Sequence, residues 1–477
     1  MENFKKNTII STLSLFFQSG YSAFLGFIAN LVLTILLSPK IFGIYFTILS
    51  IIAILNYFSD IGLAASLVQK NEVKDEEIST VFTFQQFLIL IIIIIGFFAT
   101  NFIVNFYSLP PEGKYLYWTL LLSFFLSSLK TIPSILLERK IQFQKIVFVQ
   151  IIENTFFYLT VIILALLKFD LYSFTWAVIL RAIVGVIFIY KISPWKIKIN
   201  FNFPILKKLL SFGIPFQLSS FLALIKDDLM TLYLGKTLGF QTLGYLGWAK
   251  KWAEAVLRIV MDSLSRVLFP VFSRVQDNKE KLKTLVEKII YYQSLIIIPV
   301  IFGMILVMEK LVFLIPKYTK WQVALPYFYL FSFSALLSSY STPFINLLNG
   351  LGKVKTSLYF MIFWTAGTWI LTPILTSMYG GIGFPITLVI LSSSFMLVLL
   401  TAKKIVNFSF LRNFYPFFIC SILFFIIQNY LPFQKNNFIN LLMIVISSII
   451  IYLLSLYLIF KINIFDNLKK LWSQSQQ

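Results

Sequence analysis

Histidine is absent from this sequence of 477 residues, and cysteine occurs once, at Cys420. The chain therefore lacks the most common general base and metal ligand of proteins, and a single cysteine can form neither an internal disulfide nor a cysteine-based zinc site. The segment 350–356 combines glycine and lysine, but it lacks the G-x-x-x-x-G-K-[ST] spacing of a phosphate-binding loop. We predict no resident metal, no cofactor and no ATP hydrolysis, and we do not expect an enzyme.

Charged residues are also scarce. They make up 12% of the chain, whereas hydrophobic residues make up 59% and the mean hydropathy is +0.87. A soluble core cannot bury so much apolar surface, so the lipid bilayer must act as the solvent. The apolar stretches follow one another with short polar interruptions, which leaves no segment for a soluble catalytic domain. The sequence predicts an all-α polytopic membrane protein.

A helix that spans the bilayer needs about 20 apolar residues. The first apolar stretch is too long for the apolar region of a signal peptide and ends without a small-residue cleavage pattern, so we expect a retained helix. The segments 60–70 and 262–274, which each begin with an acidic residue, are predicted to be short amphipathic elbows on the membrane surface. We predict about 14 transmembrane helices, at 9–37, 41–58, 78–103, 115–136, 146–167, 171–190, 212–234, 240–260, 285–308, 322–347, 355–378, 383–402, 411–431 and 438–460.

Basic residues outnumber acidic ones by 40 to 19, which gives a formal net charge of +21. In a soluble protein such a charge would indicate nucleic-acid binding, but in a membrane protein it is typical of cytoplasmic loops. Loops on the amino-terminal side carry about 25 Lys and Arg, against about 8 on the other side. We predict a multi-pass protein of the inner (cytoplasmic) membrane with both termini cytoplasmic and no nucleic-acid partner.

Two stretches of the chain look like an internal repeat. L-S-P-K-I-F-G-I-Y (37–45) joins the first two predicted helices, and L-G-F-Q-T-L-G-Y (238–245) joins the seventh and eighth. Each is followed by a helix, an acidic elbow and a charged loop, although a coincidental similarity of glycine-containing turns remains an alternative. We place the boundary between the halves in the basic connection after the sixth helix, which gives an N-lobe at 1–195, a C-lobe at 196–405 and two further helices at 406–477.

Several ordered motifs carry a resemblance to a known family. They are the junction 37–45, D-I-G-L-A-A-S-L-V-Q (60–69), L-L-E-R-K-I-Q-F-Q-K (136–145), L-G-Y-L-G-W-A-K-K-W (243–252), V-L-F-P-V-F-S-R-V-Q (267–276) and P-K-Y-T-K-W-Q-V-A-L-P (316–326). In this order the chain resembles the polysaccharide flippases of the multidrug, oligosaccharidyl-lipid and polysaccharide exporter superfamily, which export O-antigen, capsule and exopolysaccharide repeat units. The last two helices carry no matching motif.

The resemblance implies two six-helix lobes around a central cavity, plus two C-terminal helices. It also implies that an undecaprenyl-diphosphate-linked oligosaccharide is moved from the cytoplasmic to the outer leaflet by alternating access. The expected partners are this lipid-linked oligosaccharide, membrane lipids and other polysaccharide assembly proteins.

Cations at membrane depth are costly, so they usually face a cavity, pair with an acid or serve transport. The diphosphate of the implied cargo would give them a role, because Lys and Arg bind phosphate strongly in a restricted polar site. An alternative for the cations near residue 250 is an ion-pair ladder along one helix, since charges of alternating sign recur there at every fourth residue. The candidate substrate-binding residues are Lys130, Arg181, Lys226, Lys250, Lys251 and Arg258.

Four acidic residues lie in the same predicted helices: Glu153, Asp227, Asp228 and Glu254. Buried carboxylates can carry a proton or bind Na⁺, and they can equally neutralise neighbouring Lys and Arg. The sequence leaves both roles open, so H⁺ or Na⁺ is a candidate coupling ion.

Two other functions are less consistent with the sequence. A membrane-embedded glycan polymerase or ligase would place catalytic residues in a large outer loop, and the longest such loop, 309–320, is short and basic. A drug exporter of the same superfamily usually carries cationic cargo, which a cation-rich cavity would repel.

Overall fold

The computed structural model describes residues 2–70, 72–428, 430–431 and 437–463. Throughout this part of the chain the regular structure is helical, with no β-strand. The contacts divide the chain into two compact units, unit 1 at Met1–Gly244 and unit 2 at Tyr245–Gln477. The prediction of an all-α protein is therefore confirmed.

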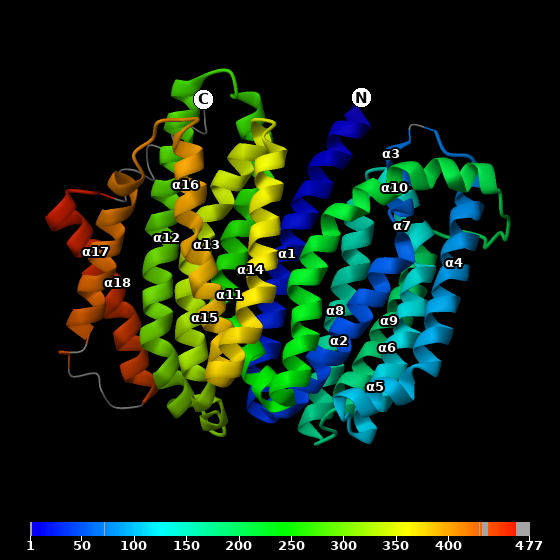
Figure 1. Cartoon of the computed structure of the whole chain (residues 1–477), viewed down its shortest axis with the longest axis horizontal. Helices are drawn as coiled ribbons and strands as arrows, with labels where there is room; N and C mark the ends of the chain where they lie inside the picture. Colours follow the sequence, from blue (N-terminus) through cyan, green and yellow to red (C-terminus); the bar gives the residue numbers. More distant parts are fainter. Residues whose placement is uncertain (1, 71, 429, 432–436, 464–477) are drawn as a thin grey trace. The chain divides into compact units, whose positions relative to one another are not determined.

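Unit 1 contains the first ten α-helices and the start of the eleventh, labelled in Figure 1. In chain order these are α1 (Glu2–Leu36), α2 (Pro39–Asp60), α3 (Leu63–Gln69), α4 (Asp75–Phe98), α5 (Thr100–Tyr107), α6 (Pro111–Leu129), α7 (Thr131–Arg139), α8 (Phe143–Leu166), α9 (Tyr172–Ile192), α10 (Phe203–Leu224), the π-helix η1 (Ile225–Leu229) and the first part of α11 (Met230–Arg274).

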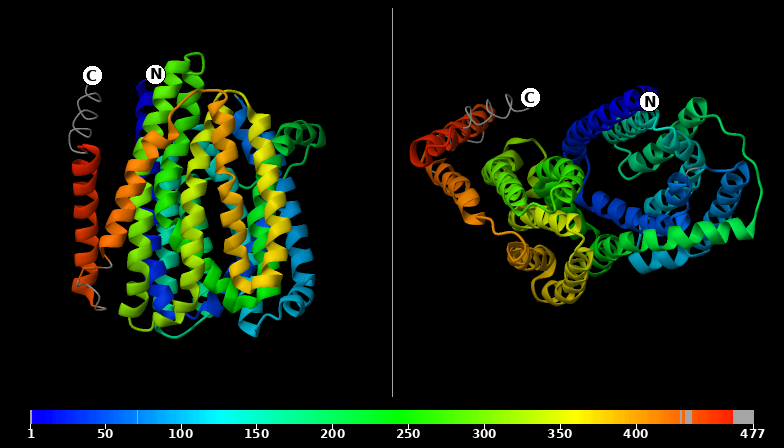
Figure 2. Two further views of the ribbon diagram at one scale, coloured as in Figure 1. Left: turned by 60° about the vertical axis from the view of Figure 1, so that its left-hand side comes forward. Right: turned by 90° about the horizontal axis from the view of Figure 1, so that it is seen from above.

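Unit 2 contains the rest of α11 and the last seven α-helices. These are α12 (Lys279–Leu314), the 3₁₀ turn η2 (Thr319–Ala324), α13 (Leu325–Gly350), α14 (Val354–Tyr379), the 3₁₀ turn η3 (Gly380–Ile382), α15 (Gly383–Ser393), α16 (Phe395–Lys403), α17 (Phe410–Gln428) and α18 (Phe438–Phe460). The last two pack against α12, and Figure 2 shows them in orange and red. Phe417 and Phe424 are buried there, and the Tyr452 hydroxyl donates to the Leu295 carbonyl at 3.0 Å.

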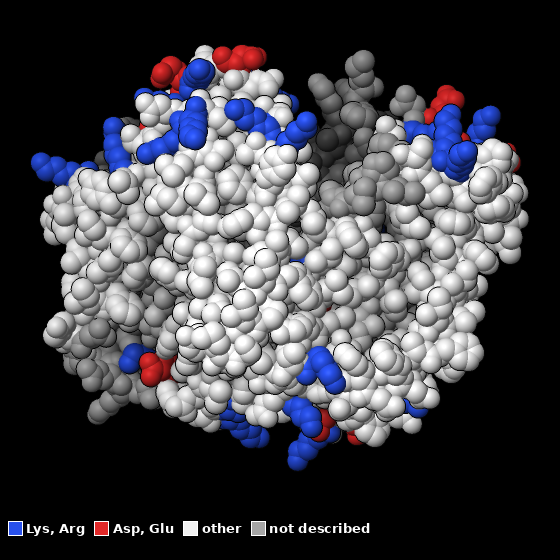
Figure 3. All heavy atoms as spheres, in the orientation of Figure 1, with Lys and Arg blue, Asp and Glu red and all other residues white. Residues whose placement is uncertain are grey.

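Eleven stretches of the described helices are long and apolar enough to cross a membrane. One of them, Val354–Lys403, is a hairpin in which α14 packs alongside α15. On the visible face of each unit, Lys and Arg gather at the helix ends and the belt between is largely uncharged (Figure 3). The chain is thus a multi-pass membrane protein. The count of about 14 crossings stays a prediction, because α10 and α11 are not among the eleven.

The two predicted elbows differ in the structure. The first is a separate helix, α3, set off by the left-handed residues Ile61 and Gly62. The second prediction was wrong, because α11 continues as helix through 262–274 to Arg274. The helical conformation of α11 is interrupted near its start instead, at Gly239, where φ is +78°. That backbone conformation is accessible to glycine at little cost, which explains the break there.

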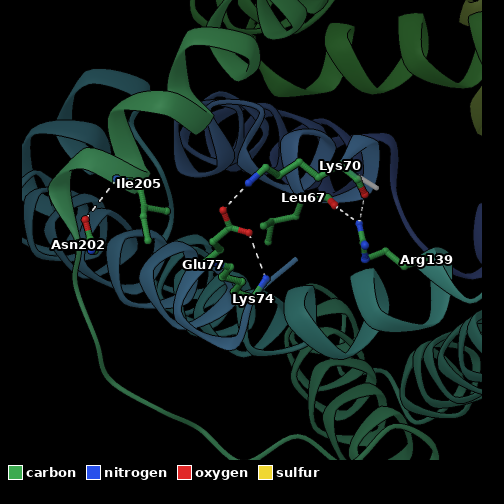
Figure 4. A network of polar contacts seen from close by, with 7 residues as sticks. All are labelled: Leu67, Lys70, Lys74, Glu77, Arg139, Asn202 and Ile205. Atoms are coloured by element: carbon green, nitrogen blue, oxygen red, sulfur yellow. Dashed lines mark hydrogen bonds and ion pairs between the residues drawn. The ribbon is translucent and has the colours of Figure 1, made fainter. Parts of the chain in front are cut away.

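The end of α3 is held by a polar network shown in Figure 4. Arg139 of α7 donates to the carbonyl oxygens of Leu67, at 2.5 Å, and Lys70, at 2.6 Å. Lys70 forms an ion pair with Glu77, which also accepts from the Lys74 backbone amide at 3.1 Å. A basic side chain on the last carbonyls of a helix satisfies acceptors that have no partner within the helix.

The two junctions that resemble each other in sequence also pack on each other within unit 1. A Cβ added at Gly43 would overlap the backbone of Phe240, and a Cβ added at Gly244 would overlap the backbone of Pro39. When the junctions are aligned on Leu37 and Leu238, Gly43 matches Gly244 and Pro39 matches Phe240. The contact is therefore reciprocal, as expected for two copies of one element around a pseudo-two-fold axis.

The contacts place α10 in unit 1, where it packs on α3 and α4. The lobes predicted at 1–195 and 196–405, the separate segment 406–477 and the central cavity stay predictions.

Candidate functional site

A buried ion pair lies inside unit 1. Lys130, between α6 and α7, places its Nζ 2.5 Å from Oε1 of Glu153 on α8, and only 4% of Glu153 is exposed. The carboxylate fits because Gly185 of α9 has no side chain, since a Cβ there would overlap Glu153. A pair in a low-dielectric interior is costly to separate, because the remaining charge has no compensation. Glu153 is therefore placed where it can neutralise Lys130.

Arg181 lies one helical turn from this pair. On α9 it precedes Gly185 by four residues, and its guanidinium carbon lies 5.7 Å from the ring centre of Phe157, which follows Glu153 by four residues on α8. One turn is a rise of about 5.4 Å. Lys130, Glu153 and Arg181, which we call the cationic cluster, have two positive charges and one negative charge. The surplus positive charge is that of Arg181, which is exposed and has no carboxylate partner within the described residues.

Aromatic residues surround Arg181. Tyr45 of α2 and Tyr158 of α8 lie near enough to it for an electrostatic interaction, and Tyr45 stacks on Phe174 with ring centres 4.1 Å apart. A guanidinium that packs on an aromatic ring keeps its donors in a defined plane, which suits bidentate binding of a phosphate.

Lys226, Asp227 and Asp228 lie together in η1, the single π-helical turn between α10 and α11. Asp227 is exposed, and its backbone carbonyl accepts from the Thr231 hydroxyl at 2.8 Å. Single π-turns inside helices often occur at functional sites. The structure therefore places these charges in a local departure from α-helical geometry.

The remaining candidates lie on α11 in unit 2. Lys250 and Glu254 are four residues apart, with Nζ and Oε1 separated by 4.0 Å, and Lys251 is exposed. The backbone of Arg258 belongs to α11, but its side chain lies outside the described part of the structure. The described side chains thus contain only the first pair of the ion-pair ladder considered above. They contain no group of three or more acidic residues or cysteines able to hold a metal ion.

Comparison with known proteins gives the family. A family described as polysaccharide biosynthesis protein matches residues 32–326, which is more than half of the chain. The chain belongs to this family.

Two curated proteins match most of this chain. The lipopolysaccharide biosynthesis protein WzxC of Escherichia coli is 25% identical over 352 residues, covering 72% of this chain and 69% of WzxC. The succinoglycan biosynthesis transport protein ExoT of Rhizobium meliloti is 22% identical over 342 residues, covering 72% of this chain and 68% of ExoT. The fold is similar to that of the lipid II flippase MurJ in an inward closed conformation, with a TM-score of 0.71, 16% identity and coverage of 95% of this chain and 99% of MurJ.

The structure also joins uncharged polar residues that the sequence analysis did not single out. Hydrogen bonds between α1 and α8 link Ser11 to Gln144 at 2.8 Å, Gln18 to Gln150 at 2.7 Å, Tyr21 to Thr155 at 2.6 Å and Ser22 to Asn154 at 3.2 Å. We call these eight residues the polar seam. These residues are uncharged, so a search for charged residues does not find them. The signal in the sequence is the recurrence of amides and hydroxyls at helical spacing within two apolar stretches.

Proposed function

We propose that this polysaccharide biosynthesis protein is a flippase, which moves an undecaprenyl-diphosphate-linked oligosaccharide from the cytoplasmic to the outer leaflet by alternating access. The name of ExoT describes a transport protein, and the name of MurJ describes a flippase of lipid II. Both names favour a protein that transports a lipid-linked sugar and disfavour a membrane-embedded enzyme. In this proposal the lobes 1–195 and 196–405 alternate, and both termini are cytoplasmic.

Arg181 carries the proposal. It is an exposed cation within a membrane-spanning helix, and no described carboxylate neutralises it. Such a residue is expensive in lipid, so its retention needs a ligand or an aqueous path. A diphosphate supplies the matching charge and geometry, because a guanidinium binds phosphate oxygens through two parallel hydrogen bonds.

The other candidates take supporting roles in this proposal. Lys226, Lys250, Lys251 and Arg258 attract the same anionic head group as it passes. Lys130 is satisfied by Glu153 and acts mainly through the shape of the cluster. Asp227, Asp228 and Glu254 either balance nearby cations or couple transport to H⁺ or Na⁺. A cationic drug is a poor cargo for a cluster with surplus positive charge.

The test is reconstitution of the purified protein into liposomes with labelled lipid-linked oligosaccharide extracted from the producing strain. We expect protein-dependent movement of the label between leaflets, detected by a sugar-modifying reagent that cannot cross the membrane. Movement of a cationic dye with no movement of the lipid-linked sugar would favour drug export and contradict the proposal. Elongation of the glycan would identify a polymerase instead.

A further inference from the structure

Polar amides are exposed within the polar seam, in helices that otherwise face lipid. Gln150 is exposed on α8, and Gln18 is partly exposed on α1. The lipid-facing side of α8 is marked by exposed apolar residues, among them Phe148 and Ile163. At about 100° per residue, Gln150 lies about 200° around the helix from Phe148. The Gln150 amide therefore points away from the apolar side of its own helix.

The hydrogen bond between Gln18 and Gln150 uses only one polar atom of each side-chain amide. Gln18 Nε2 donates to Gln150 Oε1 at 2.7 Å. The side-chain oxygen Oε1 of Gln18 and the side-chain nitrogen Nε2 of Gln150 have no hydrogen-bond partner among the described residues. An acceptor and a donor thus stand side by side, and lipid chains can satisfy neither. Water, or a ligand with hydroxyl or amide groups, can supply the partner.

The pair also shares a face with the cationic cluster. Gln150 and Phe157 are seven residues apart on α8, which places them within about 20° of each other and about 10.5 Å apart along the axis. Phe157 carries Arg181 on its ring, and Asn154, which also belongs to the seam, lies between them. A molecule with an anionic group at Arg181 and a hydroxyl-rich chain next to it matches this order.

We infer that Gln18 and Gln150 form a subsite for the sugar residues next to the diphosphate of the cargo, an inference that rests on the proposed flippase function. The neutral amides suit neutral sugars, whose hydroxyl and acetamido groups donate and accept at neighbouring positions. In this arrangement Arg181 recognises the anionic head group common to all such lipids. The amide pair distinguishes a sugar-bearing lipid from one without sugar.

The experiment compares two probes on the full-length protein in detergent. One probe is undecaprenyl diphosphate, and the other is the same lipid carrying the repeat unit extracted from the producing strain. Binding is measured per folded molecule for the wild type, for Gln18→Leu/Gln150→Leu and for Arg181→Gln. The matched control is Gln86→Leu, which removes an amide–hydroxyl bond of 3.0 Å to Ser128 elsewhere in unit 1.

We expect the double variant to bind the sugar-bearing lipid about tenfold more weakly, because about two hydrogen bonds are lost, and to bind undecaprenyl diphosphate as the wild type does. Arg181→Gln should weaken the binding of both probes, and Gln86→Leu should weaken the binding of neither. If the double variant keeps the wild-type preference for the sugar-bearing lipid, the subsite inference is overturned while the flippase proposal stands. Equal weakening of the binding of both probes has the same consequence. Binding of neither probe by the wild type would overturn the flippase proposal as well. Gln150→Ala, which removes the free donor together with the acceptor of the Gln18 bond, gives the same comparison where the double variant does not fold.

Discussion

The buried pair of Lys130 and Glu153 gives the most quantitative prediction. Breaking a buried ion pair by removing one partner costs about 3–5 kcal/mol, because the other charge stays buried. The Lys130 side chain is 19% exposed, so solvent compensates part of this cost. We expect Glu153→Gln and Lys130→Met each to lower the free energy of unfolding by about 2–3 kcal/mol, measured by titration of mixed micelles with a denaturing detergent.

The double variant Lys130→Met/Glu153→Gln is the decisive member of this cycle. It removes both charges, so its loss should be smaller than the sum of the single losses by at least about 1.5 kcal/mol. Its head-group binding should stay close to that of the wild type, because Arg181 is unchanged. Additive losses, or single variants as stable as the wild type, would refute the assignment of Glu153 to charge neutralisation.

Three further predictions concern other parts of the chain. Gly43→Ala and Gly244→Ala should each lower the apparent melting temperature through a loss of about 1–3 kcal/mol, because the added Cβ meets backbone, whereas Gly20→Ala, with nothing within 4 Å, should be tolerated. If Asp227 or Asp228 couples transport, its replacement by Asn should abolish the response of proteoliposomes to an imposed pH or Na⁺ gradient and preserve cargo binding; an intact response in both variants would exclude coupling by this pair. A single cysteine placed in the segment 194–208 of a Cys420→Ser background should be labelled only from the cytoplasm, and one at Lys317 only from outside, with reversed labelling contradicting the orientation.

The helices could be predicted from the sequence because apolar length and charged boundaries are local properties. Most of every predicted stretch is helical in the part of the chain that the structure describes, although single turn residues at Ala99, Lys130 and Ser394 divide three of the stretches. The segment 262–274 was harder to predict, since an acidic start and an amphipathic pattern are compatible with both a separate elbow and the end of a long helix such as α11. Continuity depends on packing that the local sequence does not contain.

The partners of the charged side chains could not be predicted. Lys130 and Glu153 are 23 residues apart, and their contact depends on how α8 meets the junction of α6 and α7. It depends also on Gly185, whose missing side chain makes room for the carboxylate. Arg181 and Lys130 look equivalent in the sequence, and only the structure distinguishes the paired cation from the one without a described carboxylate partner.

The reciprocal contact of the two junctions, in contrast, had a signal in the sequence. The glycines at 43 and 244 were visible as a weak internal similarity, for which chance was an alternative. Their packing on each other's matched positions gives that similarity a physical reason, because two backbones can approach so closely only where no side chain intervenes.

Transport by Arg181 variants shows whether this residue binds the diphosphate of the cargo. Flipping of the strain's own lipid-linked oligosaccharide should be measured in liposomes that contain equal amounts of folded wild type, Arg181→Gln, Arg181→Lys and Lys130→Met/Glu153→Gln. We expect Arg181→Gln to lose at least about tenfold in rate, Arg181→Lys to recover part of it because the charge returns without the bidentate geometry, and the double variant to stay close to the wild type. A wild-type rate in Arg181→Gln would contradict recognition of the diphosphate by Arg181.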